Sequence, residues 1–510
     1  MPKNISLCIV SGLLLAGPFL NPLLFPVAWV AFVPLFWVMD QAQSLRRAIF
    51  LGWLTGFTAH LVGFYWLVYT ISVFGEFSYP LSSVVFLIYA ALQGLQMAIF
   101  ALFVRSMGLG PLQIFPALFW VAVEFWFPLL FPWHLANTQS SFLWFIQTAD
   151  LVGPYGAGWV IMWCNAAIYK LAFAARRDRA ACWLAVAYAA LFVFLSATYG
   201  IQRLTSIREE MAGARKLSVA AVQGNIDVDL KWNPTKAKQN LANYLDLTKQ
   251  AENIPVVLWP ESSVEVWLPD DFAVLPPEFM PTLTAERGYF IFGARSFQGR
   301  PGASNFQAFN TAFITDRSGR LLGRYHKQVL LAFGEYLPFA KILSRFPAMP
   351  FADGFTPGDG PRVFYLFRQV RLAPLICYED LMPDLSRRFV KETKANLLVN
   401  LTNDAWYGRT AAPWQHARLA QLRAIETRRS LLRVTNTGVT TFINAKGEFV
   451  ESLPIFTPGI LKTEAEILDE ETLYVRFGDW FAWGMTLVAI AIILWFWRRS
   501  LRLVLGRVWL

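Results

Sequence analysis

The sequence has little charge for its length of 510 residues. Only 16% of the residues are Asp, Glu, Lys or Arg, whereas 55% are hydrophobic and 16% are aromatic. This composition is too apolar for an ordinary soluble protein, so much of the surface must face lipid. The formal net charge is +10, but residues 200–479 are nearly balanced. We therefore attribute the positive excess to membrane topology and expect no nucleic-acid surface.

Histidine and cysteine are scarce, at four residues each. The histidines lie at positions 60, 134, 326 and 416 without the spacing of metal ligands, so we expect no metal site and no cofactor. Three of the cysteines fall in or beside long apolar segments: Cys8, Cys164 and Cys182. Cys377 is thus left without a disulfide partner, and its position alone is compatible with either a core residue or a nucleophile.

Eight apolar segments approach or reach the ~20 residues that are needed to cross a bilayer. They cover residues 4–20, 23–39, 50–73, 80–104, 111–131, 157–175, 181–199 and 480–497. Prolines interrupt the first two, which could be tilted spans or a hairpin, and a cleaved signal peptide is the alternative for the first. We expect a helical membrane domain of about seven spans over residues 1–199, and a final span with a basic tail over 480–510.

Lys and Arg are absent from the loops 74–79 and 132–156 but present in the alternating ones. The basic residues of those other loops and of the tail are Arg46, Arg47, Arg105, Arg176, Arg177, Arg179, Arg498, Arg499, Arg502 and Arg507. The positive-inside rule places them on the cytoplasmic side. Both termini are then cytoplasmic and residues 200–479 extracytoplasmic, which in a bacterium is the periplasmic side of the inner membrane.

Residues 200–479 have a different pattern from the apolar segments. Short β-rich runs such as KLSVAAVQGNI, IPVVLWPESS, GYFIFGAR and RLAPLICYED are bounded by turn residues, and helical patterns intervene at 236–250 and 411–429. Strands that alternate with helices indicate one α/β domain of about 280 residues with a largely mixed sheet.

Three of the β-rich runs end in groups whose chemistry is complementary. Cys377 ends an apolar run, Glu261 closes VVLWPESS, and Lys327 follows RLLGRYH. A thiol, a carboxylate and an ammonium supply a nucleophile, a general base and an oxyanion-stabilising cation. Each has a simpler alternative, since Glu261 could cap a helix and Lys327 could be a solvated hairpin charge. Spacing alone does not bring the three together.

The ordered segments WPES, YHKQVLLAFGEYLP, ICYED and NLTNDAWYG resemble the nitrilase superfamily, whose catalytic trio is Glu, Lys and Cys. With spans before and after this region, nearly the whole chain is similar to the apolipoprotein N-acyltransferases within that superfamily. The resemblance implies an extracytoplasmic nitrilase-like αββα sandwich over residues 200–479. One departure is Ala332, where the family's loop is expected to have Pro, and it affects only the local loop shape.

The resemblance also implies roles for individual residues. Glu261 would be the general base, Lys327 the cation for the oxyanion, and Cys377 the nucleophile. Supporting roles fall to Glu335, Tyr378 and Glu379. Substrate binding falls to Trp133, Trp232 and Asn310, although an interfacial aromatic belt would equally explain the two tryptophans.

The implied reaction is a ping-pong transfer through a thioester on Cys377. The donor would be a phospholipid, expected to be phosphatidylethanolamine, and the acceptor the α-amino group of the diacylglyceryl-cysteine at the N-terminus of an apolipoprotein. Aromatic and aliphatic residues alternate with Pro and Gly in residues 338–361. We expect this segment to be a lipid-facing lid hinged near 354–360, and a core-packing loop is the alternative.

Two other functions stay open on the sequence. A membrane-tethered amidase could use the same trio on a small amide, and it would need a closed polar pocket. A transporter with an accessory outer domain would need charged residues within its spans, for which Glu124 and Lys170 are the candidates.

Overall fold

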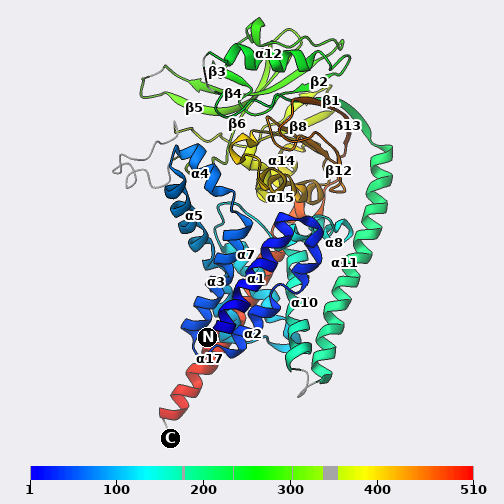
Figure 1. Cartoon of the computed structure of the whole chain (residues 1–510). Helices are drawn as coiled ribbons and strands as arrows, with labels where there is room; N and C mark the ends of the chain where they lie inside the picture. The colour runs from blue at the N-terminus through cyan, green and yellow to red at the C-terminus, as the bar shows by residue number, and fades with distance from the viewer. Residues whose placement is uncertain are drawn as a thin grey trace. The chain divides into compact units, whose positions relative to one another are not determined.

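The computed structural model describes residues 2–174, 179–231, 233, 235–300, 302–336 and 354–508. The chain divides into two compact units. The helical unit comprises Met1–Tyr65, Ser83–Leu204 and Phe477–Leu510, and the sandwich unit comprises Trp66–Ser82 and Thr205–Arg476. Both units are drawn in Figure 1.

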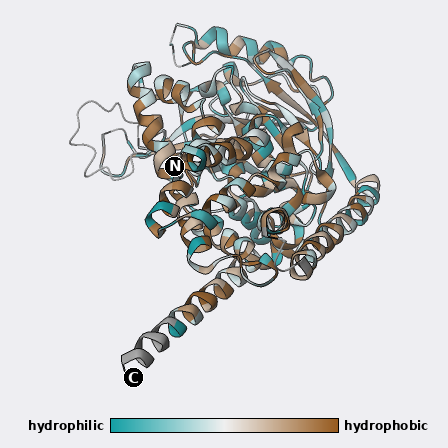
Figure 2. Cartoon of the chain, turned by 60° about the horizontal axis from the view of Figure 1, so that its bottom comes forward, coloured by the Kyte–Doolittle hydropathy of each residue, from teal (hydrophilic) through white to brown (hydrophobic). Residues whose placement is uncertain are grey.

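The helical unit is built mainly from long apolar helices. They are α1 (Pro2–Leu20), η1 (Pro22–Trp29), α2 (Val33–Gln41), α3 (Leu45–Gly63), α5 (Tyr79–Gln93), α6 (Leu95–Met107), α7 (Phe115–Trp126), α10 (Tyr155–Ala174), α11 (Arg179–Gly213) and α17 (Trp480–Val508). Hydrophobic residues run along many of these ribbons in Figure 2, including the helix that leads to the C-terminus.

Five helices of the described residues are long and apolar enough to cross a membrane, or six if the broken pair Leu45–Gly63 and Leu67–Gly75 is one span. The predicted count of eight is therefore not confirmed. The longest helix in the segment 111–131 is the twelve-residue α7, which follows the short 3-10 helix η2 (Pro111–Gln113) and ends before Pro128. The segment 157–175 is helical, as α10.

The core of the helical unit is aromatic. Phe32 packs edge-on against Trp120 with ring centroids 5.2 Å apart, and Phe100 packs on the same indole at 5.4 Å. Glu124 is buried at the end of α7, where its Oε1 accepts the Leu135 N–H at 2.7 Å. This bond holds the start of the short helix η3 (Leu135–Gln139), which gives Glu124 a role in the fold.

The sandwich unit contains two sheets. The first has seven strands in the order β13-β1-β2-β4-β5-β6, with β3 paired to β4, and the second has six in the order β12-β11-β10-β9-β8-β7. The strands of the first are β1 (Arg215–Gln223), β2 (Val256–Leu258), β3 (Val264–Pro269), β4 (Tyr289–Gln298), β5 (Gln307–Asp316), β6 (Leu321–His326) and β13 (Gly459–Ile467). Those of the second are β7 (Phe364–Leu366), β8 (Val370–Ile376), β9 (Leu397–Thr402), β10 (Leu431–Thr435), β11 (Thr441–Ile443) and β12 (Phe449–Ser452).

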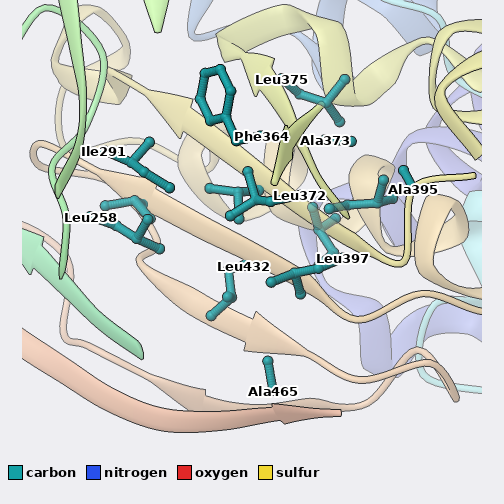
Figure 3. Packing of buried hydrophobic residues seen from close by; sticks show 14 of the residues in the cluster. Leu258, Ile291, Phe364, Leu372, Ala373, Leu375, Ala395, Leu397, Leu432 and Ala465 are labelled. Atoms are coloured by element: carbon teal, nitrogen blue, oxygen red, sulfur yellow. The ribbon is translucent and has the colours of Figure 1, made fainter. Parts of the chain in front are cut away.

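Helices cover the outer faces of the two sheets. The first sheet carries α12 (Ala237–Thr248), and the second carries α14 (Pro383–Thr393) and α15 (Ala412–Thr427), as Figure 1 shows. The inner faces enclose one apolar core, in which Leu258 and Ile291 of the first sheet lie opposite Phe364 and Leu372 of the second (Figure 3). The predicted nitrilase-like αββα sandwich is therefore present, with a mixed sheet in each inner layer.

The last part of one segment assigned to a membrane span belongs to the sandwich unit. The apolar run 50–73 breaks after α3, and α4 (Leu67–Gly75) packs within the sandwich unit against η6 (Asp404–Tyr407). The rings of Phe74 and Trp406 lie 4.0 Å apart. Hydropathy alone does not distinguish an apolar helix that faces lipid from one that packs on protein.

Candidate active site

The three residues of the predicted trio each follow a strand of the sandwich. Cys377 comes directly after β8, Lys327 directly after β6, and Glu261 three residues after β2. α/β folds place reactive side chains at the C-terminal ends of strands. The backbone leaves the sheet there, so the side chain is free from packing within the sheet.

Cys377 has a strained backbone. Its φ of 54° lies in the left-handed region, at the first residue of the turn η5 (Cys377–Leu381). This conformation costs a non-glycine residue about 1–2 kcal/mol, so the surrounding structure must impose it. Burial and Glu261 together raise the pKa of the thiol to about 12, although Lys327 and the Thr402 hydroxyl act in the opposite direction. The resting residue is therefore a neutral thiol.

A buried network of opposite charges joins the other two members of the trio. Lys327 Nζ lies 2.7 Å from Glu335 Oε2 and 4.0 Å from Glu261 Oε1. Asn310, on β5, donates its Nδ2 hydrogens to both carboxylates, at 2.8 Å to each. The amide thus holds Glu261 and Glu335 apart while the ammonium neutralises them.

The charges in this network follow from burial and pairing. Burial opposes the charged form of Lys327, but Glu335 and the other anionic groups outweigh it and raise the pKa of the ammonium. Burial raises the pKa of Glu261, and Lys327 and Asn310 act in the opposite direction. Lys327 therefore stays protonated, and Glu261 is a stronger base than an exposed glutamate.

Glu379 joins the Lys327 segment to the nucleophile turn. Its Oε1 accepts from the Tyr325 hydroxyl at 2.9 Å and from the N–H groups of Gln328 and Val329 at 2.7 and 3.0 Å. Its Oε2 accepts the Ile376 N–H at 2.8 Å. This fully buried carboxylate, whose pKa burial raises to about 7, fixes Lys327 relative to Cys377 from behind. Tyr378, beside the thiol, is also buried.

The substrate-binding candidates lie in different parts of the chain. Asn310 belongs to the charged network of the site. Trp133 is buried in the helical unit, where its Nε1 lies 3.3 Å from His60 Nε2. Trp232 lies outside the described residues. Its neighbour Lys231 is buried and donates from Nζ to the Glu261 carbonyl at 3.2 Å, and burial lowers the pKa of this lysine to about 8.

The predicted lid falls largely outside the described residues, which resume at Gly354. Its described end is hydrogen-bonded to the site. The Phe355 N–H donates to the Glu335 carbonyl at 3.0 Å, and the Gly358 N–H donates to the Lys327 carbonyl at 2.8 Å. The predicted hinge region therefore shares backbone hydrogen bonds with two residues of the site, and the lid itself stays a prediction.

A glycine allows the Glu261 loop to reach its place. A Cβ on Gly293 of β4 would lie 2.6 Å from both Glu261 Cα and Ser262 N, closer than real side chains come. The loop after β2 can therefore lie directly on β4 only because residue 293 has no side chain.

Several residues that the structure places around the thiol were not among the predicted site residues. Thr402 ends β9 and faces the thiol, and Asp404 influences it electrostatically. Both belong to the quoted segment NLTNDAWYG, and Asp380 belongs to ICYED. Polar residues at strand ends within those segments were the available signal. No group of His, Cys, Asp and Glu suited to a metal ion occurs within the described ranges.

Replacing Asn310 by Asp tests the charged network. A third carboxylate would face Glu261 and Glu335 with only one ammonium between them, so we expect turnover to fall by about 10²-fold or more. Initial rates of the purified protein measure the effect. Asn243→Asp, at a partly exposed position of α12, introduces the same charge change and should keep wild-type activity. Equal rates for the two variants would contradict the proposed function of Asn310.

Family comparisons match both parts of the chain. Residues 11–167 match the family model described as apolipoprotein N-acyltransferase N-terminal domain, and residues 218–467 match that of carbon-nitrogen hydrolase. The second match agrees with the sandwich fold.

Relatives of known name are similar over almost the full length. An apolipoprotein N-acyltransferase of Geobacter metallireducens is 32% identical over 94% of this chain and 93% of its own. The protein of the same name from Pseudomonas syringae is 28% identical over 91% and 90%. Among solved structures, an amidase from Nesterenkonia sp. is 19% identical with a TM-score of 0.35, covering 52% of this chain and 94% of its own.

Proposed function

The chain belongs to the apolipoprotein N-acyltransferase family, and we propose that it catalyses acyl transfer through a thioester on Cys377. The acyl donor is a phospholipid, with phosphatidylethanolamine as the expected headgroup. The acceptor is the α-amino group of the diacylglyceryl-cysteine at the N-terminus of an apolipoprotein. The reaction completes the maturation of the lipoprotein.

One observation carries this proposal. A strained cysteine at a strand end shares electrostatic interactions with a buried lysine and a buried glutamate, which themselves lie 4.0 Å apart. A thiol, a base and a cation in one place are the groups that covalent acyl transfer requires. The match of residues 11–167 to the N-terminal domain of N-acyltransferases favours this reaction over a small-amide hydrolase.

In the first half-reaction, Glu261 removes the proton of the Cys377 thiol and the thiolate attacks an ester carbonyl of the phospholipid. The Lys327 ammonium stabilises the negative charge on the tetrahedral oxygen. The C–O bond to glycerol then breaks, and Glu261 returns the proton to the leaving alkoxide. The products are a lysophospholipid and a thioester on Cys377.

In the second half-reaction, the α-amino group of the acceptor attacks the thioester carbonyl. Glu261 takes the proton from the attacking nitrogen, the C–S bond breaks, and the proton passes to the thiolate. An amide forms and Cys377 is again a thiol. Water must be kept away between the two steps, since it would hydrolyse the thioester. A lid formed by residues 338–361 would serve this purpose.

The proposed topology places the chemistry at a membrane surface. The chain is a membrane protein with several apolar helices of spanning length. The distribution of Lys and Arg supports both termini in the cytoplasm of a bacterium and the sandwich unit on the periplasmic side of the inner membrane. Both substrates are lipid-anchored, so a site at that surface would receive them without extracting them from the bilayer.

Mass spectrometry of the purified protein after incubation with phospholipid tests the proposal. We expect the mass of one acyl chain on the peptide that contains Cys377, and its removal by hydroxylamine, which cleaves thioesters. The buried cysteines 8, 164 and 182 provide internal controls and should stay unmodified. An unmodified Cys377 in a preparation that still transfers acyl chains would overturn the mechanism.

A further inference from the structure

Five polar side chains form a buried cluster beneath the nucleophile turn. They come from five elements of the sandwich unit, η5, β9, η6, α15 and β10, and none is more than 4% exposed. We call them the charge cluster: Asp380, Asn400, Asp404, His416 and Arg433. Buried charges are costly unless they are paired, so this arrangement requires a physical reason.

The charge cluster is bonded directly to the nucleophile turn. Asn400 donates from Nδ2 to the Cys377 carbonyl at 3.0 Å and also to Asp380 Oδ2. Arg433 is the neighbour of Asn400 across the parallel pair β9 and β10, and its Nη1 binds the same Asp380 oxygen. Asp380 lies in η5 itself, so the position of Cys377 depends on how this carboxylate is held.

His416 bridges two carboxylates. Its Nε2 lies 3.0 Å from Asp380 Oδ1, and its Nδ1 lies 3.0 Å from Asp404 Oδ1. Asp380 also accepts from Asn400 and Arg433, and Asp404 Oδ2 lies 3.8 Å from Arg433 Nη2. Asp380 accepts from an amide and a guanidinium, and Asp404 faces the same guanidinium, so we take both carboxylates to be ionised and able only to accept. Both ring nitrogens must then donate, which makes the ring an imidazolium.

This protonation balances the buried charge. Burial lowers the pKa of Arg433 to about 9, which leaves the guanidinium charged at neutral pH. Arg433 and an imidazolium at His416 supply two positive charges against the two of Asp380 and Asp404. A neutral ring would leave one uncompensated negative charge in the interior below the thiol. A glycine at 438 makes room for the arrangement, since a Cβ there would collide with the Asp404 carboxylate.

We propose that His416 is a doubly protonated positioning residue that ties the nucleophile turn η5 to η6 and keeps the charge beneath Cys377 balanced. The inference rests on the proposed role of Cys377 as the nucleophile. His416 touches neither substrate nor the reacting atoms. It acts through Asp380, whose partner Asn400 holds the Cys377 carbonyl, and through Asp404 on the opposite side of its ring.

The charges of the charge cluster should affect the pKa of the Cys377 thiol. Asp404 raises the pKa of Cys377, and Arg433 interacts with the thiol electrostatically. Other groups that face the thiol include Glu261, Lys327, Thr402 and Tyr407, and the ring of Tyr407 also packs edge-on against His416. Loss of the imidazolium would add net negative charge beside a group that must become an anion, and so make the thiolate harder to form.

Alkylation of Cys377 by iodoacetamide in the full-length protein tests this consequence, because only the thiolate reacts. In His416→Gln we expect the pH–rate profile to show about tenfold slower alkylation at each pH between about 7 and 9, because less thiolate is present. In the double variant His416→Gln/Asp404→Asn one carboxylate is also removed, so charge balance returns and the rate should recover. A packing role for the ring alone would not be rescued by Asp404→Asn.

Lys249→Gln serves as the charge-matched control. It removes one positive charge from an exposed ion pair with Asp246 on the surface of the sandwich unit, and it should leave the profile unchanged. A His416→Gln profile that coincides with that of the wild type, or a double variant displaced as far as the single one, would overturn the proposal.

The wild-type protein offers a test that does not depend on how the variants fold. The sequence has four histidines, so ¹⁵N-histidine labelling gives few NMR signals. We expect one ring with both nitrogens protonated at pH 8, whose signal is absent from either His416 variant. A neutral His416 ring at pH 8 would contradict the inference. Neither readout depends on which acyl group Cys377 carries, so failure of the proposed acyl transfer remains separately visible.

Discussion

Cys377→Ala should abolish acyl transfer, with a fall in rate of at least about 10⁴-fold. The remaining groups of the site can bind and polarise a carbonyl, but none of them can carry the acyl group between donor and acceptor. The measurement is transfer from phospholipid to a diacylglyceryl peptide by the purified variant. Full transfer by Cys377→Ala would exclude a thioester at this position and with it the two-step mechanism.

The matched control is Cys164→Ala, which removes a buried thiol of the helical unit. It deletes the same atom from a site without catalytic partners and should leave the rate near that of the wild type. A third variant separates strain from chemistry. Cys377 has a φ of 54°, which Gly adopts freely, so Cys377→Gly should be at least as stable to heat as Cys377→Ala although both are inactive.

The strand ends of the sandwich could be predicted because their signal is local. An apolar run followed by a polar group marks the point where a strand leaves the core, and Cys377 follows such a run directly, whereas Lys327 directly follows the β-rich run RLLGRYH. The sequence around neither residue indicates which sheet its strand joins. β6 belongs to the first sheet and β8 to the second. Contacts between residues far apart in the sequence determine which sheet each strand joins.

The charge cluster could not be predicted for the same reason. Asp380 and Arg433 are 53 positions apart, and each on its own is a common residue in a turn or a strand. A buried arginine in an apolar strand is unusual, but the sequence does not show that the strand is covered on both faces. Only the fold brings the guanidinium and the carboxylate together.

The predicted count of eight spans is not confirmed, because hydropathy measures composition and not surroundings. The run 50–73 is apolar throughout, yet its last part forms α4 within the sandwich unit. Leu67 of this helix is buried, and Phe74 lies against Trp406. Apolar helices bury themselves in either environment, so the break between Gly63 and Leu67 has no clear hydropathy signal.

Lys327→Met should have the second large effect, because it removes charge stabilisation and stability together. Lys327 is 2% exposed and neutralises the buried carboxylates of Glu335 and Glu261. Removing one partner of a buried pair costs about 3–5 kcal/mol, and losing a donor to the oxyanion lowers turnover by about 10²–10³-fold. Thermal unfolding and initial rates measure the two losses separately.

The loss of stability in Lys327→Met should depend on pH. Burial already raises the pKa of Glu261, and Lys327 is the largest influence that lowers it. Without the ammonium that pKa rises further above the unfolded value of about 4.3. The folded state then binds more protons than the unfolded one, so stability is retained at pH 5 and lost as pH rises toward 8. A destabilisation equal at both pH values would show that the lost packing of the side chain, and not its charge, is responsible.

Two further variants separate the effect of the Lys327 charge on stability from its effect on turnover. Lys327→Met/Glu335→Gln removes one of the stranded carboxylates, so it should recover part of the stability at pH 8 while the rate stays low. Lys249→Met removes an exposed lysine that is 71% accessible and paired only at the surface, and it should change neither property. If the double variant recovered activity together with stability, the ammonium would be needed only to hold the site together, and another group would have to stabilise the oxyanion.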